Sequence, residues 1–549
     1  MKYYSLIRSH FPYKTFNPGQ YEAIAFALEQ FVDYEEKHVI LDLPTGIGKS
    51  AVAHTIYKCL QELSNREKYI GTFISPRINL QEQYCNEFSD LVSLTGKTNY
   101  ECPKFPGTVY NTGDCRESRH SGTCEFFDKG ECPYVKARNK WCNKSNGRVT
   151  NTSFMIEACD LLINKPHNRS SLITVDECHT LDKLLIDHCT IILDLKSVNY
   201  LKKFKFDKLL SRFEECIKLF AKIKIGEPFD LSTHDSFMNK LRTINLVNAA
   251  ERYRELLEGR LNSDELKDVS NSAVKSKRSV LYQAIEELEQ ITDKIKLLYS
   301  GELTNIIISE SSHNRVVIKP VFAREVAWYG LYRKADKFLH ISATIVGKNL
   351  YCQDMGLPRI TPYFSANNPI PVKNRTITID STIKVSGNKN HSNLFNGIKK
   401  IIDKHGDQPG IIHTVSYNLA EEIVANVNSD RFVVTSDYKE IRGILKSSNK
   451  IVVSPAIEEG VDLKESMFQI IAKTPYLFLG DVHVKLNLNT KLWYDRKTMI
   501  RVIQMCGRSV RGVNDYADTY VLDNTFINVL DKCMNITPKW FLEGIDIVQ

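Results

Sequence analysis

The chain has 549 residues, of which 42% are apolar, and its formal net charge is +8. This length exceeds what one hydrophobic core usually organises, so we expect several domains. No run of eighteen apolar residues occurs, and residues 1–20 are too polar and aromatic for a secretion signal. These features argue against membrane association and predict an intracellular, cytoplasmic protein.

The first predicted elements follow an α/β rhythm, in which a short apolar strand is followed by a loop and an amphipathic segment. This rhythm occurs at residues 38–60, 71–88 and 172–187. Parallel strands of this kind place their loops at one edge of the sheet, where ligands bind. The pattern predicts a first α/β domain.

Two segments interrupt this domain. Residues 96–150 are rich in Gly, Asn, Lys and Cys and show no helical or strand period, so we expect an insertion held by something other than a core. From residue 191 to about residue 300 the chain is rich in Lys and Glu, and an apolar stripe that includes Leu281, Leu288 and Leu298 recurs at helical spacing. This predicts a second, all-helical insertion whose stripe forms ordinary packing core.

Strand-like segments return at residues 305–321 and 338–345, and we expect the first to belong to the return path of the second insertion. A second α/β domain follows, with predicted strands at 410–414, 431–435, 450–454, 468–472 and 519–523. The predicted organisation is a first domain at 1–95, 151–190 and 305–350, insertions at 96–150 and 191–304, and a second domain at 351–549.

A phosphate-binding loop is predicted after the first strand. The strand leads into Pro44, Thr45, Gly46, Ile47, Gly48, Lys49 and Ser50, and a helical segment follows. Glycines let backbone N–H groups close around phosphates, Lys49 can reach the β and γ phosphates, and Ser50 can ligate Mg²⁺. Leu43 replaces the first glycine of the usual pattern, but Gly46 supplies similar freedom. The loop therefore predicts binding of ATP and Mg²⁺.

A second buried-strand pattern, residues 171–175, ends in Asp176, Glu177, Cys178 and His179. Asp176 can hold Mg²⁺ through water, and Glu177 can orient and deprotonate the water that attacks the γ-phosphate. An Asp-Glu pair after a strand is usually a solvated loop. The phosphate loop upstream favours the catalytic interpretation here.

Two arginines near the C-terminus, Arg508 and Arg511, are three residues apart, which predicts that they lie on one face of a helix. From the second domain they could stabilise the charge that develops on the γ-phosphate. Taken alone, the segment would be interpreted as a surface helix with two solvated arginines.

These residues resemble motifs of superfamily 2 helicases. Residues 49–50, 176–179 and 504–511 resemble motifs I, II and VI. Further resemblances, in chain order, are to the upstream glutamine motif at 16–20, motif Ia at 75–83, motif III at 342–344, motif IV at 413–417 and motif V at 454–463. Together they resemble the DinG/XPD-type iron–sulfur helicases, with Cys178 in the alanine position of the DEAH box.

The resemblance implies an α/β fold of two RecA-like parallel-sheet motor domains, with an iron–sulfur insertion and a helical arch insertion in the first. It implies that Gln20 reads the adenine edge and that His179 and residues 342–344 couple hydrolysis to strand movement. It also implies catalytic roles for Gln504, Arg508 and Arg511. The candidates for nucleic-acid contact by phosphate binding or stacking are Arg77, Thr414, Ser416 and Tyr417.

Five of the fourteen cysteines fall within residues 96–150, and they are Cys102, Cys115, Cys124, Cys132 and Cys142. The family inserts its cluster domain at this place, so the resemblance implies that the first four bind a [4Fe–4S] cluster. Zinc held by four thiolates and a set of free thiols are the alternatives, and Cys142 could replace one ligand. The segment carries ten Lys or Arg against six Asp or Glu, which suits contact with single strands.

The sequence thus predicts an ATP-dependent DNA helicase that translocates on single-stranded and forked DNA as a monomeric motor. By resemblance, movement runs 5′ to 3′ and serves DNA repair, replication or recombination. The alternatives are a helicase for RNA or RNA–DNA hybrids, and a nucleic-acid binding protein with a vestigial motor.

Overall fold

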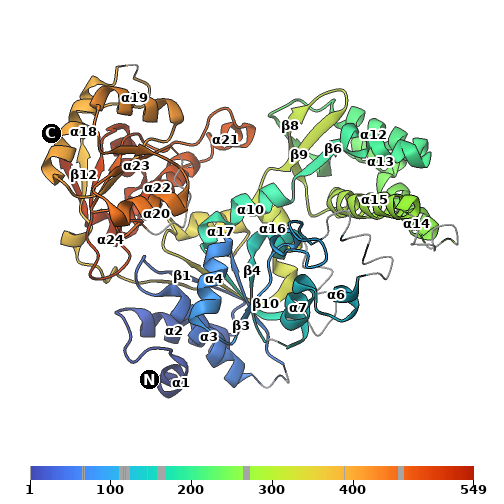
Figure 1. Cartoon of the computed structure of the whole chain (residues 1–549), viewed down its shortest axis with the longest axis horizontal. Helices are drawn as coiled ribbons and strands as arrows, with labels where there is room; N and C mark the ends of the chain where they lie inside the picture. Colours follow the sequence, from blue (N-terminus) through green and yellow to red (C-terminus); the bar gives the residue numbers. More distant parts are fainter. Residues whose placement is uncertain are drawn as a thin grey trace.

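The computed structural model describes residues 2–64, 66, 68–110, 115, 118, 124–144, 146–157, 169–261, 263, 272–388, 390–455 and 463–549. Two α/β units stand next to each other, and a third, mixed unit projects from the first (Figure 1). Each α/β unit contains a seven-stranded parallel sheet. Within the described residues, no helix combines the length and the apolar character needed to cross a bilayer.

The first sheet has the strand order β11-β1-β10-β5-β2-β4-β3. Its strands in that order are Tyr363–Ser365, His38–Asp42, Ala335–Ser342, Ser170–Asp176, Gly71–Ser75, Gly147–Asn151 and Leu91–Ser93. All seven residues of β5 are buried, as expected for a central parallel strand covered on both faces. Because β10 lies between β1 and β5, the segments that follow these three strands meet at one edge of the sheet.

Helices cover both faces of this sheet. One apolar cluster joins the sheet to α1 (Tyr4–His10), α2 (Gln20–Leu28), α3 (Lys49–Leu63) and α4 (Ile78–Glu87), and the π-helix η1 (Glu29–Asp33) continues α2. A second cluster, on the other face, joins it to α8 (Thr152–Glu157), α10 (Leu181–His188), α16 (Ala323–Gly330) and α17 (Lys348–Met355).

The second sheet has the order β14-β15-β13-β16-β17-β12-β18. Its strands in that order are Phe432–Val434, Ile451–Ser454, Gly410–His413, Phe468–Ile471, Asp518–Val521, Ile377–Asp380 and Ile545–Val548. The five strands predicted for this domain are confirmed, whereas β12 and β18 were not predicted. The helices are α18 (Ser392–His405), α19 (Tyr417–Val427), α20 (Tyr438–Ser447), α21 (Val482–Asn487), α22 (Trp493–Cys506), α23 (Thr525–Cys533) and α24 (Lys539–Leu542).

The second insertion is not all-helical, which corrects the prediction. An antiparallel sheet of order β6-β9-β8-β7 is formed by Ile191–Asp194, Arg315–Pro320, Asn305–Ser311 and Pro228–Asp230. Strand β6 pairs with β9 across more than 100 residues of intervening chain, which no local pattern reveals, whereas β8 and β9 form a hairpin within the strand-like segment predicted at residues 305–321. The helices are α11 (Leu195–Val198), α12 (Asp207–Phe220), α13 (Asp235–Ile244), α14 (Leu246–Leu261) and α15 (Ser272–Lys296). Leu281 and Leu288 of the predicted stripe are buried core, as expected.

Two strands of the first sheet lie outside the ranges predicted for that domain. Strand β4 follows the cysteine-rich segment directly, and β11 pairs with β1 beyond residue 350. The strand pattern of β4 is concealed by Arg148, which is fully buried, donates to the Cys142 carbonyl at 2.8 Å and lies over the Trp141 ring. The cysteine-rich segment itself contains α6 (Glu125–Asp128), α7 (Pro133–Asn139) and the π-helix η3 (Lys140–Lys144).

Helix α22 anchors the second α/β unit to the first. Arg496 donates to the Val346 carbonyl at 2.7 Å and to the Asp354 carboxylate at 2.6 Å. Next to it, Lys497 forms an ion pair with Asp182, in the first turn of α10. The side chain of Arg496 is only 4% exposed, so its charge depends on these partners.

We therefore expect Arg496→Met to lower the free energy of unfolding by about 1–3 kcal/mol, because a buried carbonyl and a carboxylate lose their donor. Urea denaturation followed by circular dichroism measures this. Lys532→Met is the matched control. Lys532 of α23 also pairs with a residue of α22, Asp495, but its side chain is 57% exposed. Its effect should stay below about 1 kcal/mol, and equal losses in both variants would contradict the anchoring role of Arg496.

Candidate active site

The predicted phosphate loop connects β1 to α3, and two of its glycines have left-handed backbones. Gly46 and Gly48 both have φ +85°. A Cβ at Gly46 would lie 2.1 Å from the Arg511 carbonyl oxygen of the second domain. Only glycine fits such a conformation and such a close approach. The N-terminus of α3, a helix of fifteen residues, begins at Lys49 and offers its free N–H groups to an anion.

Gln20 packs beneath this loop. It is 2% exposed, its Nε2 donates to the Ile47 carbonyl at 2.6 Å, and its Oε1 accepts from the Asn17 N–H at 2.7 Å. Gln20 therefore holds the phosphate loop in shape. Its reading of adenine stays a prediction.

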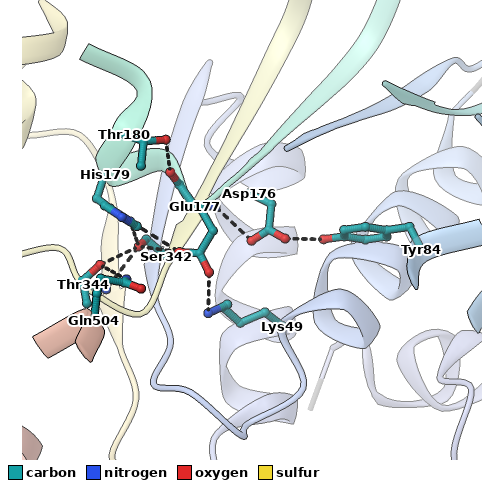
Figure 2. A network of polar contacts seen from close by, with 9 residues as sticks. All are labelled: Lys49, Tyr84, Asp176, Glu177, His179, Thr180, Ser342, Thr344 and Gln504. Carbon is teal, nitrogen blue, oxygen red and sulfur yellow. Dashed lines mark hydrogen bonds and ion pairs between the residues drawn. The ribbon is translucent and has the colours of Figure 1, made fainter. Parts of the chain in front are cut away.

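Asp176 ends β5 and lies in a buried position. Its Oδ1 accepts from the Glu177 N–H at 2.9 Å, and its Oδ2 accepts from the Tyr84 hydroxyl at 3.3 Å (Figure 2). Burial, and next the charge of Glu177, raise the pKa of Asp176 to about 6. A carboxylate in this environment is stabilised by a cation, which fits the predicted Mg²⁺ role.

Glu177 follows with a left-handed backbone, φ 51° and ψ 45°, which costs about 1–3 kcal/mol for a residue other than glycine. Its carboxylate lies 3.5 Å from the Lys49 ammonium and 3.4 Å from the His179 imidazole. Burial opposes ionisation, but the charge of Lys49 and the contact with His179 outweigh it and lower the pKa of Glu177. The side chain is thus held ionised in the cleft.

A chain of hydrogen bonds leads from Glu177 into the second domain, as Figure 2 shows. His179 Nδ1 and Ser342 Oγ are 2.8 Å apart, and Ser342 Oγ lies 3.2 Å from the Thr344 hydroxyl. Gln504 of α22 then donates to Thr344 Oγ1 at 2.7 Å. The segments after β5 and β10 are therefore connected directly to α22.

Arg508 and Arg511 lie past the end of α22, which ends at Cys506, so the prediction that they share a helix face is wrong. Gly507 terminates the helix, as glycine often does. The two arginines still reach the cleft, which is lined by Thr45, Lys49, Glu177, Gln504, Arg508 and Arg511 among others. Arg511 is close enough to Glu177 to contribute to its lowered pKa.

Sequence reasoning missed three residues near the site, which are Glu87, Tyr84 and Asp42. Ser50 donates to the Glu87 carboxylate at 2.9 Å, and the lone pairs of its hydroxyl oxygen stay available to a metal. Tyr84 contacts Asp176. The only signal in the sequence was that Tyr84 and Glu87 are three residues apart and therefore share a face of α4. Asp42, at the end of β1, is buried, and this burial raises its pKa to about 6.

The predicted nucleic-acid residues have different surroundings. Tyr417 is 61% exposed, and Ser416 caps α19 by accepting from the Leu419 N–H. Arg77 is half-buried beside the coupling residues. Thr414 is fully buried and donates to the Ser416 carbonyl at 3.0 Å, so it shapes this turn and does not offer a surface contact. Most of predicted motif V, residues 456–462, lies outside the described residues.

The four predicted cluster ligands are all buried, with exposures between 3% and 6%. Cys124 and Cys132 directly precede α6 and α7. Among the described residues, however, no group of three or more His, Cys, Asp or Glu side chains is arranged to hold a metal ion. The iron–sulfur cluster is therefore not confirmed.

Comparisons with known proteins support the two-domain fold described above. The model of the "Type III restriction enzyme, res subunit" family matches residues 13–211, and that of the "Helicase C-terminal domain" family matches residues 396–544. Among solved structures, an XPD helicase superposes with a TM-score of 0.56 at 15% identity, covering 96% of this chain and 99% of the other. Xpd4 of S. tokodaii gives 0.53 at 14% identity, with the same coverage. A search of curated proteins finds no significant match.

Fold and site define a two-domain, helicase-type ATPase with a nucleotide cleft between parallel sheets. More narrowly, the chain is similar in fold to XPD helicases over 96% of its length, which agrees with the resemblance of its motifs to the DinG/XPD-type helicases.

Glu177→Gln should lower the ATPase kcat roughly 10²–10⁴-fold with little change in KM, because the amide keeps the shape but loses the base. Steady-state phosphate release measures this. Asp187→Asn, on the exposed face of the following helix, is the control and should keep wild-type turnover. Wild-type kcat in Glu177→Gln would exclude Glu177 as the group that activates water.

Proposed function

We propose that the protein is an ATP-driven translocase and helicase on single-stranded DNA that moves 5′ to 3′. The observation that carries this is the hydrogen-bonded chain from Lys49 and Glu177 through Ser342 and Thr344 to Gln504. It connects the group that would activate water to the interface between the domains. A motor needs such a connection, because hydrolysis must alter how the two domains sit against each other.

In the proposed reaction, the N-terminus of α3 and Lys49 bind the β and γ phosphates. Ser50 and Asp176 would hold Mg²⁺, which neutralises phosphate charge when bound. Glu177, kept ionised by Lys49, orients the attacking water and takes its proton. Arg511 approaches from the second domain and stabilises charge on the transferred group. Closure of the cleft is thus required for turnover.

For nucleic acid, we propose that Tyr417 stacks on a base and that Arg77 binds a phosphate. Tyr417 is exposed at the carboxyl end of β13, and stacking of a base on an aromatic ring contributes about 1–3 kcal/mol. Arg77 lies at the start of α4, near His179 and Gln504, so a bound strand would touch the coupling chain. Stacking itself does not distinguish DNA from RNA.

The polarity is tested with matched duplexes that carry a 5′ or a 3′ single-stranded tail. We expect ATP-dependent strand displacement only from the 5′-tailed DNA, and unwinding of only the 3′-tailed substrate would overturn the direction. Lys49→Ala is the control and should displace neither. Stronger stimulation of the ATPase by single-stranded RNA than by DNA would favour the RNA helicase, and full biological function in Lys49→Ala would favour a vestigial motor.

We further propose that Cys102, Cys115, Cys124 and Cys132 bind a [4Fe–4S] cluster. The chemistry of the donors fits, because four buried thiols lie on a short segment. Three of the four share an apolar cluster with Tyr110 and Tyr134, which would exclude water from the metal. Zinc in the same four thiolates is the alternative.

Protein purified without oxygen should be brown and contain about four iron atoms and four sulfides per chain. Cys132→Ser should lose the visible absorption and most of the iron, because a serine hydroxyl is a poor replacement for a thiolate. Cys85→Ser, outside the segment, is the control and should keep both. A colourless protein with stoichiometric zinc would refute the cluster. If Cys142→Ser loses iron and the serine variant of one of the four cysteines keeps it, Cys142 replaces that cysteine as a ligand.

A further inference from the structure

Helix α4 contacts both residues that we propose hold Mg²⁺. Its Glu87 carboxylate accepts from the Ser50 hydroxyl at 2.9 Å, and its Tyr84 hydroxyl donates to the Asp176 carboxylate at 3.3 Å (Figure 2 shows the second contact). Tyr84 and Glu87 share a face of the helix, so this face lies against the two proposed ligands. The proposed reaction gives α4 no part.

Both carboxylate oxygens of Glu87 accept a hydrogen bond. Oε2 accepts from Ser50, and Oε1 accepts from the Tyr13 hydroxyl at 2.5 Å. Tyr13 lies between α1 and α2, and its carbonyl accepts from Arg8 of α1 at 2.7 Å. A carboxylate with a donor on each oxygen is held in one orientation. The half-buried Glu87 is thus a fixed partner for the Ser50 hydroxyl.

Further contacts fix the end of α4 against α3. His54, one turn after Ser50, lies 2.8 Å from the Asp90 carboxylate, and its ring stacks on Phe88 with the centroids 4.1 Å apart. Lys58, one turn further along α3, pairs with the same carboxylate at 3.3 Å. Residues four apart share a face of a helix, so all three side chains of α3 face this region. The approach of the two helices therefore does not depend on the Ser50 hydrogen bond alone.

The contact with Glu87 determines how the Ser50 hydroxyl is oriented. A serine hydroxyl has one proton and two lone pairs, and it rotates to suit its partners. The proton of Ser50 is directed to Glu87, so its lone pairs are directed elsewhere and are available to a cation. A group that holds a metal ligand in this way fixes the orientation of the ligand and raises its basicity. Loss of such a group typically lowers metal affinity about 10–100-fold.

We propose that Glu87 is a positioning residue for the binding of nucleotide with Mg²⁺, and that it acts through the Ser50 hydroxyl. Glu87 itself contacts neither the nucleotide nor the cation. This inference rests on the proposed role of Ser50 as a magnesium ligand.

The test measures nucleotide binding and does not depend on turnover. A fluorescent ADP analogue is titrated without and with Mg²⁺, and the ratio of the two dissociation constants gives the contribution of the cation. Glu87→Ala should reduce this ratio about tenfold. It should not weaken binding without Mg²⁺, because Lys49 and the N-terminus of α3 are unchanged. A variant that failed to fold would instead lose binding under both conditions.

A double-mutant cycle tests whether Glu87 acts through Ser50. Ser50→Ala should reduce the ratio at least as much as Glu87→Ala. Adding Glu87→Ala to Ser50→Ala should have no further effect, because both changes act on the same hydroxyl. A direct attraction between the Glu87 charge and the cation would persist without the Ser50 hydroxyl.

Glu87→Gln separates orientation from charge. The amide oxygen can still accept from Ser50 while the NH₂ group faces the Tyr13 oxygen, so we expect this variant to keep most of the wild-type ratio. Glu62→Ala is the matched control. Glu62 lies at the other end of α3 and also contacts the N-terminal segment, through His10 at 2.7 Å, but its side chain is 59% exposed. This variant should keep the wild-type ratio.

A wild-type ratio in Glu87→Ala would overturn the inference, and so would an effect of Glu87→Ala that persists in full in the Ser50→Ala background. Equal losses in Glu87→Gln and Glu87→Ala would assign the effect to charge and would overturn it as well. The proposed role of Ser50 fails in a different way, through a wild-type ratio in Ser50→Ala. A reduced ratio in Ser50→Ala, combined with a wild-type ratio in Glu87→Ala, rejects only the role of Glu87.

Discussion

The arrangement of this protein depends on the ion pair between Lys49 and Glu177. It joins the first residue of α3 to the residue after β5, and it brings together the two groups that we propose bind phosphate and activate water. Both side chains are less than 20% exposed, so the charge of each is stabilised mainly by the other. The parallel sheet makes this pairing possible, because β10 alone separates β1 from β5.

Strand β10 also connects the site to the second domain. Ser342, its last residue, contacts both His179 and the Thr344 hydroxyl, and Gln504 reaches Thr344 from the other domain. Helix α22 therefore has two contacts with the first domain. Its N-terminal turn is fixed by Arg496 and Lys497, and its C-terminal end carries Gln504 and the arginines.

The third unit of the molecule shows how an insertion can be built without disturbing the motor sheet. It leaves after β6 and returns through β8 and β9, and these strands pair with one another. Helix α21 of the second domain lies next to it, and His483 contacts the Val321 carbonyl at 2.9 Å. The insertion thus touches both domains (Figure 1).

The sequence by itself predicted the family resemblance, the order of the motifs and the candidate site residues Lys49, Asp176, Glu177 and the two arginines. These residues follow from local patterns, since a phosphate loop needs glycines and a lysine at fixed spacing after a strand. Most strands of the two parallel sheets were also predicted, because buried parallel strands are apolar runs that stand out locally.

Only the tertiary structure decided which residues meet. The prediction that Arg508 and Arg511 share a helix face failed because their three-residue spacing does not show whether the helix extends to them. Helix α22 ends before them, at Cys506. Thr414 was placed at the surface because a polar residue in a loop looks the same whether it is buried or exposed. Strand β4 was missed because Arg148 conceals its apolar pattern, and β11 was missed because it is only three residues long. The contact of Ser50 with Glu87 arises from packing between elements that no local pattern connects.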